Sequence, residues 1–250
     1  MARLLQVSTV AITLRTFLVP IAGHFTEMGW RVDALAHGAA SAPRLPFFTE
    51  CWEIGWSRNP WSVGSLRRAV ARVREVVGRG DYDIVHVHTP VAAFITRLAL
   101  AGWRRAGRPQ VIYTAHGFHF HRGGRPWKNF LFRGLEKLAG RWTDYLVVIN
   151  REDEEAARRY RLVPPERLRY MPGIGVDTEH YAPARVAAGE VEAVRAELGV
   201  PLAAPLFLMI AEFNPGKRHR EALRALARME DRRPHLALAG TGPLFAETRE

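Results

Sequence analysis

The 250-residue sequence predicts an α/β protein built on a doubly wound parallel sheet, and three observations lead to this prediction. Short aliphatic runs alternate with helical patterns through most of the chain. Glycines such as Gly29, Gly78 and Gly102 follow the helical runs, where helices commonly end. No internal repeat or low-complexity tract interrupts the alternation. Such alternation favours a mainly parallel sheet covered by helices on both faces.

The elements of the first part follow in chain order. Strands are expected at Arg3–Ser8, Arg31–Ala36, Asp83–His88, Gln110–Thr114, Tyr145–Ile149 and Leu168–Met171. Helices are expected at Leu14–Met28, Val63–Val77, Val91–Ala101, Pro126–Trp142 and Glu152–Tyr160, the last one capped by Asn150. The stretch Pro43–Pro60 is expected to be irregular.

A turn-rich segment at residues 172–177 marks a boundary. We expect a Rossmann-like N-terminal domain over residues 1–180, a linker with a helical pattern over residues 181–200, and the start of a second Rossmann-like domain over residues 201–250. In this last part the sequence predicts strands Leu206–Ile210 and His235–Ala239, with helix Arg220–Met229 between them. Two strands and one helix bury little core, so we expect this domain to be incomplete and the chain to be truncated.

Composition limits the class of protein. The chain is 48% hydrophobic and 24% charged, as in ordinary globular proteins. No apolar run approaches the ~18 residues of a membrane span, and we expect no signal peptide. A lone cysteine, Cys51, excludes an internal disulfide framework and favours a cytoplasmic location. The net charge of +11 leaves open an anionic membrane, phosphorylated substrates or nucleic acid, or an arginine-rich composition without a partner. Nucleic acid is not expected, because no recognised binding motif accompanies the charge.

Polar side chains gather where strands are expected to end. Ligands of open parallel sheets bind beyond the carboxyl ends of the strands. Thr9 and Thr13 follow the first strand. Five of the ten histidines lie at only two other strand ends: His86, His88, His116, His119 and His121. The sequence therefore places a candidate site at this edge of the sheet.

Three kinds of chemistry are open at this edge. His86, His88 and His116 are a candidate metal triad, but no carboxylate or cysteine accompanies them at a recognisable metal spacing. A nucleophile–base pair is weaker, since Cys51 lies in an irregular stretch and no G-x-S-x-G motif is present. A polyol pocket fits best, because neutral imidazoles and hydroxyls can donate to and accept from sugar hydroxyls. No strand is followed by G-x-G-x-x-G and the sequence contains no P-loop, which argues against dinucleotide binding and against phosphate binding by a P-loop.

Four strings carry a resemblance to a known family: residues 81–90 (DYDIVHVHTP), 113–120 (YTAHGFHF), 144–150 (DYLVVIN) and 172–177 (PGIGVD). In order and spacing they resemble the family-4 retaining glycosyltransferases. The closest match is the subgroup that builds capsular polysaccharides, exopolysaccharides and lipid-linked oligosaccharides. The resemblance covers essentially the whole chain, but only about two thirds of the length of a typical member.

The resemblance implies a GT-B fold, in which two Rossmann-like domains enclose a cleft. The N-terminal domain takes the acceptor, so that Thr9, Thr13, His86, His88 and His119 are expected acceptor-binding residues. His116 matches the histidine that positions the donor sugar for retaining transfer. On the donor side, Lys217 matches the basic residue that grips the diphosphate, and Gly242 lies in a turn that approaches the nucleotide.

The implied substrates are a nucleoside-diphosphate sugar that donates a hexose-type unit and a lipid-linked or growing glycan that accepts it, with no metal or other cofactor. Two departures from the family pattern matter. Glu212 stands where many members have arginine, and the Glu-x7-Glu element that grips the donor should lie beyond Glu250. The alternative function is therefore a non-catalytic fragment that binds only acceptor or membrane.

The stretch His121–Trp142 mixes basic and aromatic residues. Its basic members are Arg122, Arg125, Lys128, Arg133, Lys137 and Arg141, and its large apolar members are Trp127, Phe130, Leu131, Phe132, Leu135, Leu138 and Trp142. This mixture suits an anionic membrane interface, and it equally suits a helix with its apolar stripe in the core. The resemblance favours the membrane and a peripheral position at the inner face of the plasma membrane. The acidic run at residues 152–155 is expected to complement a helix dipole rather than to catalyse.

Overall fold

The computed structural model describes residues 1–41, 45–56, 63–102, 108–229 and 234–249. Two compact units divide the chain, Met1–Gly175 and Val176–Glu250, and each is described by itself. In the described parts of the chain, no helix combines the length and the apolar character that a membrane crossing requires.

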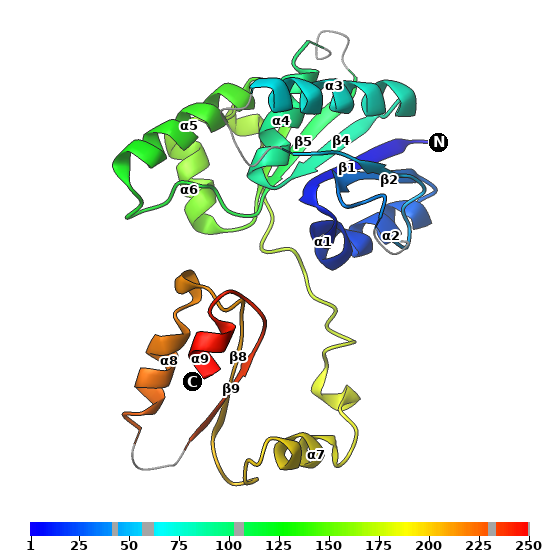
Figure 1. The fold of residues 1–250 in the computed structure, drawn as a ribbon. Helices are drawn as coiled ribbons and strands as arrows, with labels where there is room; N and C mark the ends of the chain where they lie inside the picture. The colour runs from blue at the N-terminus through cyan, green and yellow to red at the C-terminus, as the bar shows by residue number, and fades with distance from the viewer. Residues whose placement is uncertain (42–44, 57–62, 103–107, 230–233, 250) are drawn as a thin grey trace. The chain divides into compact units, whose positions relative to one another are not determined.

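The first unit is built on a seven-stranded sheet in the order β3-β2-β1-β4-β5-β6-β7, and neighbouring strands pair in parallel (Figure 1). The strands are β1 (Arg3–Val10), β2 (Arg31–His37), β3 (Cys51–Glu53), β4 (Ile84–His88), β5 (Gln110–Ala115), β6 (Tyr145–Val148) and β7 (Leu168–Tyr170). The chain reverses its direction of winding between β1 and β4. Such a reversal is the usual place for a ligand in an open parallel sheet.

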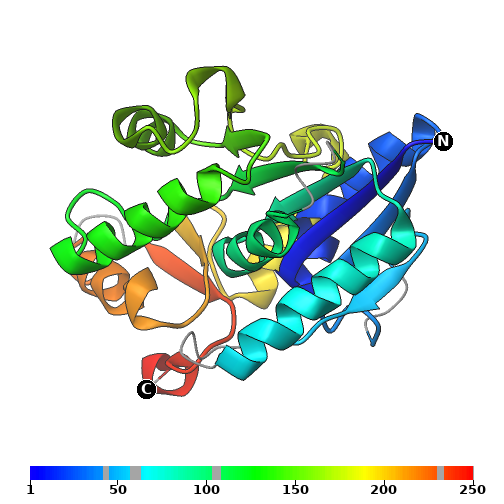
Figure 2. The same cartoon turned by 90° about the horizontal axis from the view of Figure 1, so that it is seen from above.

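Helices cover both faces of this sheet, as Figures 1 and 2 show. One face carries α1 (Ala11–Thr13), the π-helical turn η1 (Leu14–Leu18) and α2 (Val19–Glu27). The other carries α3 (Val63–Gly80), α4 (Pro90–Leu100), α5 (Pro126–Gly140) and α6 (Arg151–Tyr160), and a 3-10 turn, η3 (Pro165–Arg167), precedes β7. The predicted α/β class and the doubly wound parallel sheet are therefore confirmed.

Strand register explains how the two faces differ. Leu4 pairs with Val32 and Ile84, and all three contribute to the core beneath η1 and α2. The next residue, Leu5, pairs with Val85 and points to the opposite core, which α3 and α4 cover. Successive strand residues point to opposite faces, so an apolar run such as Leu4-Leu5 fills both cores.

Two element predictions need correction. The first helix begins at Ala11 rather than at Leu14 and contains the π-helical turn. A strand that the sequence did not predict, β3, lies inside the stretch 43–60 that was expected to be irregular; part of that stretch falls outside the described residues. β3 has only three residues and pairs only with β2 among the described strands. Three residues carry too little alternation to be recognised as a strand.

The predicted cap of α6 is confirmed. Asn150 Oδ1 accepts a hydrogen bond from the backbone N–H of Asp153 at 2.8 Å. The first turn carries Glu152, Asp153 and Glu154, where negative charge complements the helix dipole. Glu154 also forms ion pairs with Arg151 at 2.6 Å and with Arg158 at 2.9 Å.

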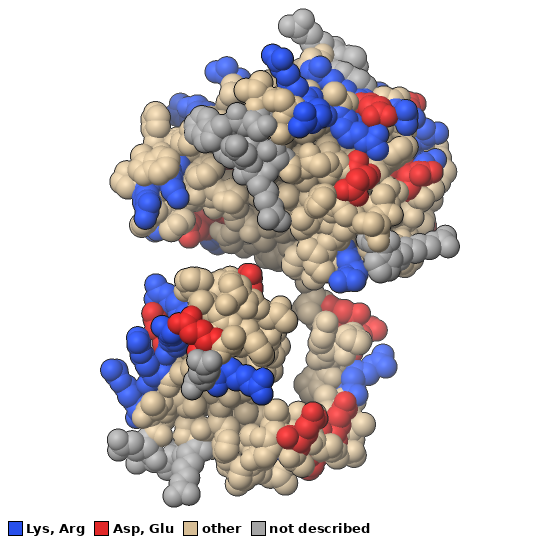
Figure 3. Space-filling view, in the orientation of Figure 1, with Lys and Arg blue, Asp and Glu red and all other residues tan. Residues whose placement is uncertain are grey.

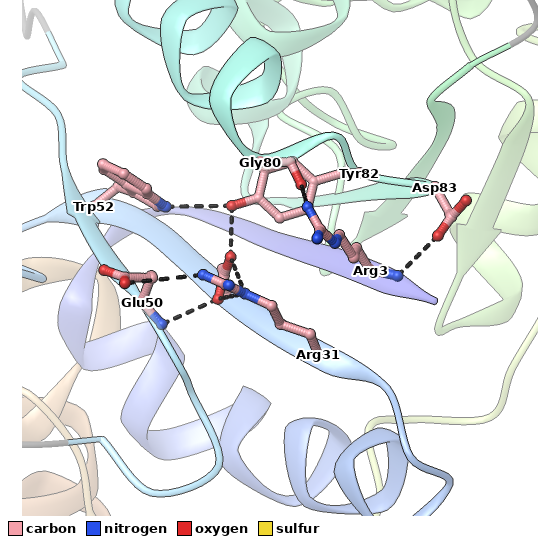
Figure 4. A network of polar contacts seen from close by, with 8 residues as sticks. Arg3, Arg31, Glu50, Trp52, Gly80, Tyr82 and Asp83 are labelled. Carbon is pink, nitrogen blue, oxygen red and sulfur yellow. Dashed lines mark hydrogen bonds and ion pairs between the residues drawn. The ribbon is translucent and has the colours of Figure 1, made fainter. Parts of the chain in front are cut away.

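A buried polar network lies near the amino ends of β1, β2 and β4 (Figure 4). Asp33 is 1% exposed and accepts hydrogen bonds from Arg31 Nε at 3.1 Å, from the Glu50 N–H at 3.0 Å and from the Tyr82 hydroxyl at 2.8 Å. Trp52 Nε1 donates to the same hydroxyl at 3.2 Å. Burial first, and then the bond to Asp33, raise the pKa of Tyr82 above its usual range, so Tyr82 stays a donor. The network ties β2 to β3 and to the segment that enters β4.

The second unit contains a parallel pair, β8 (Leu206–Ile210) and β9 (His235–Ala239), whose bounds match the two predicted strands. Its helices are α7 (Glu190–Glu197), α8 (His219–Leu226) and α9 (Phe245–Arg249), with short 3-10 turns η4 (Pro183–Arg185) and η5 (Pro215–Lys217). Apolar side chains of β8 are exposed, Leu208 by 63% and Ile210 by 77%. Two strands thus leave much of their apolar surface uncovered.

Candidate functional site

The candidate site lies at the carboxyl ends of β1, β4 and β5, beside the reversal in strand order. Parallel pairing aligns these ends, because His88 is opposite Thr114 and Val87 is opposite Tyr113. His116 follows β5 directly. The sheet topology therefore brings together histidines that are 28 residues apart in the sequence.

Three of the predicted histidines form one cluster. The Nδ1 atom of His88 lies 3.1 Å from Nε2 of His116. The ring of His86 lies 4.1 Å from that of His88, centroid to centroid, and its Nε2 lies 2.8 Å from the Thr114 hydroxyl. The predicted proximity of His86, His88 and His116 is confirmed, while their roles stay predictions.

Burial keeps these imidazoles neutral at ordinary pH. The pKa of His86 falls to about 4, first because of burial and then because of the nearby His116. Burial also lowers the pKa of His88 well below 6.5, and it lowers that of His116. Neutral imidazoles offer one donor and one acceptor each, which suits hydroxyl groups better than anions.

The described residues contain no group of three or more His, Cys, Asp or Glu side chains placed to hold a metal ion. The rings of His86 and His88 pack against each other instead of converging on a common point. This geometry favours hydrogen-bond chemistry at the cluster.

Hydroxyl groups extend the cluster toward β1. The Thr9 and Thr89 hydroxyls are 2.6 Å apart, and the backbone N–H of Thr9 donates to Thr89 Oγ1 at 3.1 Å. Thr89 has a φ of 65°, which is rare for a β-branched residue and marks backbone strain at this strand end. Thr9, expected after the first strand, lies near the end of β1, and its role in acceptor binding stays a prediction. No sequence signal reveals the strain at Thr89.

Two predicted site residues lie apart from the cluster. His119 is exposed, and its ring contacts Phe132 on α5 at 5.2 Å between centroids. Gly117, with a φ of 134°, turns the chain away from the line of β5 before His119 is reached. Thr13 lies in α1 and makes no side-chain hydrogen bond within the described part of the chain. Neither residue shares a hydrogen bond with the described histidines of the cluster.

Gln6 is a site residue that the sequence analysis missed. Its side chain is fully buried, and Oε1 lies 2.8 Å from Nε2 of His88. The available signal was a single amide within the apolar run of β1. An isolated polar residue in a strand is usually predicted to face solvent, so only the tertiary structure reveals that Gln6 is buried and has a partner.

A hollow of about 660 Å³ lies beyond the histidine cluster, between the loop after β5, α5 and α6. Its lining includes Phe120, Arg133 and Tyr160. The Arg133 guanidinium stacks over the Tyr160 ring at 4.7 Å, and its Nε donates to the Asn129 carbonyl. The segment Gly117–Phe120 connects His116 to this hollow along the chain.

In the second unit, the loops that follow β8 and β9 pack against each other. The Phe213 N–H donates to the Thr241 carbonyl at 2.9 Å. Gly242 has a φ of 151°, and a Cβ there would lie 2.6 Å from the Phe213 carbonyl oxygen. Glycine is therefore required where the two loops meet. Lys217, at the end of η5, is exposed, and within the described residues only its backbone N–H makes a hydrogen bond, to Asn214.

Comparison with known proteins identifies the family. The model of the glycosyl transferase 4-like domain matches residues 14–173. A Bacillus subtilis (strain 168) protein named as a glycosyltransferase, EpsD, is 35% identical over 242 residues, 96% of this chain and 61% of that protein. The UDP-Gal:alpha-D-GlcNAc-diphosphoundecaprenol alpha-1,3-galactosyltransferase of Escherichia coli is 32% identical over 136 residues, 54% of this chain and 32% of that protein. The chain thus spans less than two thirds of either relative.

Solved structures share the fold at low identity. Anabaena Alr3699/HepE, in complex with UDP and glucose, superposes with a TM-score of 0.71 at 18% identity and covers all of this chain and 63% of that one. A glycosyltransferase from Rickettsia africae superposes with a TM-score of 0.69 at 16% identity, over 99% of this chain and 62% of that one. The family model covers more than half of the residues, including the histidine cluster at the sheet edge. The chain therefore belongs to the glycosyl transferase 4-like domain family.

Proposed function

We propose that this chain forms the acceptor-side domain and the beginning of the donor-side domain of a GT-B glycosyltransferase. The reaction is transfer of a hexose-type sugar from a nucleoside-diphosphate sugar to a lipid-linked or growing polysaccharide, with retention at the anomeric carbon. One observation carries the proposal: the neutral cluster of His88 and His116 at the carboxyl edge of the sheet.

The role of His116 follows from its charge and position. A neutral imidazole can hold a sugar hydroxyl without attracting the donor diphosphate to the wrong place. Its ring is half-buried and fixed from behind by His88, so little reorganisation is needed when the sugar binds. In this proposal His116 orients the donor sugar, and His86, His88 and Thr9 form the polar floor beside it.

The donor diphosphate is assigned to the second unit. Lys217 precedes α8, where backbone N–H groups and the helix dipole favour anions. Its ammonium makes no ion pair with the described residues, so its charge is available to a phosphate. Gly242 lies in the turn after β9, where the missing side chain lets the Phe213 backbone pack closely, and in this proposal the turn that the two loops form faces the nucleotide.

The acceptor is proposed to be lipid-linked, and three observations support this. The E. coli relative is named for transfer to a diphosphoundecaprenol-linked sugar. Trp127 and Phe130 on α5 are 62% and 76% exposed, so they do not belong to the core. Basic side chains also lie on this helix and its preceding loop, although Figure 3 shows Lys and Arg over α3 as well. Exposed aromatic residues beside basic ones distinguish α5 as the surface for an anionic membrane.

The test is transfer by the longest natural form of the protein, with a panel of nucleoside-diphosphate sugars and polyprenyl-diphosphate-linked acceptors. His116→Ala should lower kcat by about 10²-fold, the usual effect of removing one preorganised polar contact. The melting temperature should change little, because the ring is half-buried. His37→Ala is the matched control, since His37 also ends a strand but lies outside the cluster.

Two results would contradict the proposal. A loss of stability of several kcal/mol in His116→Ala, like that of a core truncation, would make His116 a packing residue. Retained acceptor binding with no turnover for any donor would favour the alternative of a binding fragment without catalysis. Product stereochemistry, read from the anomeric configuration, tests retention separately.

A further inference from the structure

The contact between Gln6 and His88 determines where protons lie in the histidine cluster. Gln6 and His88 are both buried to 99% or more, and no solvent competes for their hydrogen bonds. The amide oxygen Oε1 of Gln6 faces Nε2 of His88 at 2.8 Å. On the opposite side of the same ring, Nδ1 faces Nε2 of His116 at 3.1 Å. The three side chains thus form a hydrogen-bonded series that begins at Gln6 and ends at His116.

Hydrogen-bond chemistry allows only one proton arrangement along this chain. An amide oxygen accepts and never donates, so Nε2 of His88 must carry a hydrogen. A neutral imidazole has a single N–H, which leaves Nδ1 of His88 as an acceptor. Nε2 of His116 must then be the donor across the 3.1 Å contact. Nδ1 of His116 is left with a free lone pair.

The argument requires both rings to be neutral, because an imidazolium donates from both nitrogens. Burial lowers the pKa of His88 well below 6.5, and the neighbouring His86 and His116 lower it further. Burial also lowers the pKa of His116. Both rings are therefore neutral at pH 7.

We propose that Gln6 and His88 are positioning residues that hold His116 in its Nε2–H tautomer, with Nδ1 as a fixed acceptor. No described residue forms a hydrogen bond with Nδ1 of His116, so this lone pair is available to a ligand. If the proposed function holds, the group that meets Nδ1 is a donor, as a sugar hydroxyl is. A carboxylate or phosphodiester oxygen carries no proton at neutral pH, so it cannot donate and would be rejected there. The pair thus sets specificity for a hydroxyl at this position.

The first test needs no substrate, and a variant serves only to assign the signals. The 250-residue protein is labelled with ¹⁵N-histidine, and two-bond ¹H–¹⁵N correlation spectra are recorded at neutral pH. The His116 signals are assigned by their loss in His116→Asn. We expect a protonated Nε2 and a bare Nδ1. A protonated Nδ1, or an even mixture of the two tautomers, would overturn the assignment, since it would mean that the Gln6 amide presents its nitrogen to His88.

The second test removes the amide oxygen of Gln6, which is the acceptor at the beginning of the hydrogen-bonded series. Gln6→Leu keeps similar bulk but accepts no hydrogen bond, so the His88 proton is released to move to Nδ1 and the Nδ1–H form of His116 should appear. Gln110→Leu is the control, because Gln110 is exposed and makes no side-chain hydrogen bond to the described residues. An unchanged His116 tautomer in a folded Gln6→Leu protein would remove Gln6 from the mechanism. If this variant does not fold, the wild-type spectrum still decides the assignment.

These outcomes are separate from those of the proposed function. An Nε2–H tautomer in a protein without turnover would count against the glycosyltransferase assignment and leave the positioning role intact. Turnover by a protein whose His116 carries its proton on Nδ1 would do the reverse.

Discussion

Tyr82→Phe removes one oxygen atom from the buried network in Figure 4 and leaves the ring in place. The lost hydroxyl donates to Asp33 at 2.8 Å and accepts from Trp52 Nε1 at 3.2 Å. Asp33 keeps its bonds from Arg31 and from the Glu50 backbone, so it remains partly compensated. The change therefore tests the hydroxyl alone.

The expected cost has two parts. A buried hydrogen bond to a carboxylate contributes about 1.5–3 kcal/mol, and the unpaired Trp52 N–H adds about 1 kcal/mol because Trp52 is half-buried. The sum is about 3 kcal/mol of the free energy of unfolding. For a unit of this size each kcal/mol moves the melting temperature by about 2–4 °C, so a fall of about 6–12 °C is expected.

Tryptophan fluorescence during urea unfolding measures this cost in the first unit alone, because all seven tryptophans lie before residue 176. Tyr170→Phe is the matched control, since its hydroxyl has no hydrogen-bond partner among the described residues while its ring stacks with Arg151. A loss below about 0.5 kcal/mol for Tyr82→Phe, or an equal loss for the control, would refute the reasoning. A Tyr82→Phe/Trp52→Phe double mutant then isolates the coupling between the two side chains.

Three further predictions concern acid, membranes and donor binding. The pKa of His86 is about 4 in the folded state and 6.5 in the unfolded state, so its contribution to stability should be complete above pH 6.5 and be lost toward pH 4, by up to about 1.4 kcal/mol per pH unit. A urea midpoint that does not change over that range would contradict the burial of His86 as a neutral ring. Binding of the protein to liposomes should require anionic lipid and should weaken in 1 M salt, where the screening length is about 3 Å. It should also fall in the Trp127→Ser/Phe130→Ser variant, whereas equal binding to neutral liposomes would indicate hydrophobic adhesion alone. The 250-residue chain alone should show no micromolar affinity for uridine or guanosine diphosphate sugars, because the exposed Lys217 contributes only about 0–1 kcal/mol to a contact with phosphate. One clear micromolar isotherm in titration calorimetry would overturn this prediction.

The sequence predicted the part of the site that depends on strand direction. All strands of a parallel sheet end at the same edge, so polar residues that follow β4 and β5 must approach one another. This rule predicts that His88 and His116 lie together, and the 3.1 Å contact between their rings confirms it. The same reasoning overreached at His119, because a glycine with positive φ, Gly117, turns the backbone after His116. Loop geometry is not contained in strand alternation.

The parts that could not be predicted depend on partners far away in the sequence. Gln6 meets His88 across 82 residues, and Asp33 meets Tyr82 across 49. Gln6 and Asp33 each interrupt an apolar strand, and the sequence pattern alone treats such a residue as a weakness of the strand rather than as a buried hydrogen-bonding group. The short strand β3 was missed for a related reason: its position depends on pairing between Ala34 and Cys51, and not on its own three residues.

The two ends of the seven-stranded sheet hold two buried polar networks that differ in how completely their hydrogen-bonding groups are paired. At the amino ends, both carboxylate oxygens of Asp33 are hydrogen-bonded, and an anion satisfied in this way contributes to stability. At the carboxyl ends, the described residues leave Nε2 of Gln6 without a partner and Nδ1 of His116 free. Unused polar capacity lowers stability, so a fold gains nothing from it unless a ligand completes the bonds. Open parallel sheets bind ligands at the carboxyl ends of their strands, and the free Nδ1 of His116 lies there, which is the physical reason for placing function at this end.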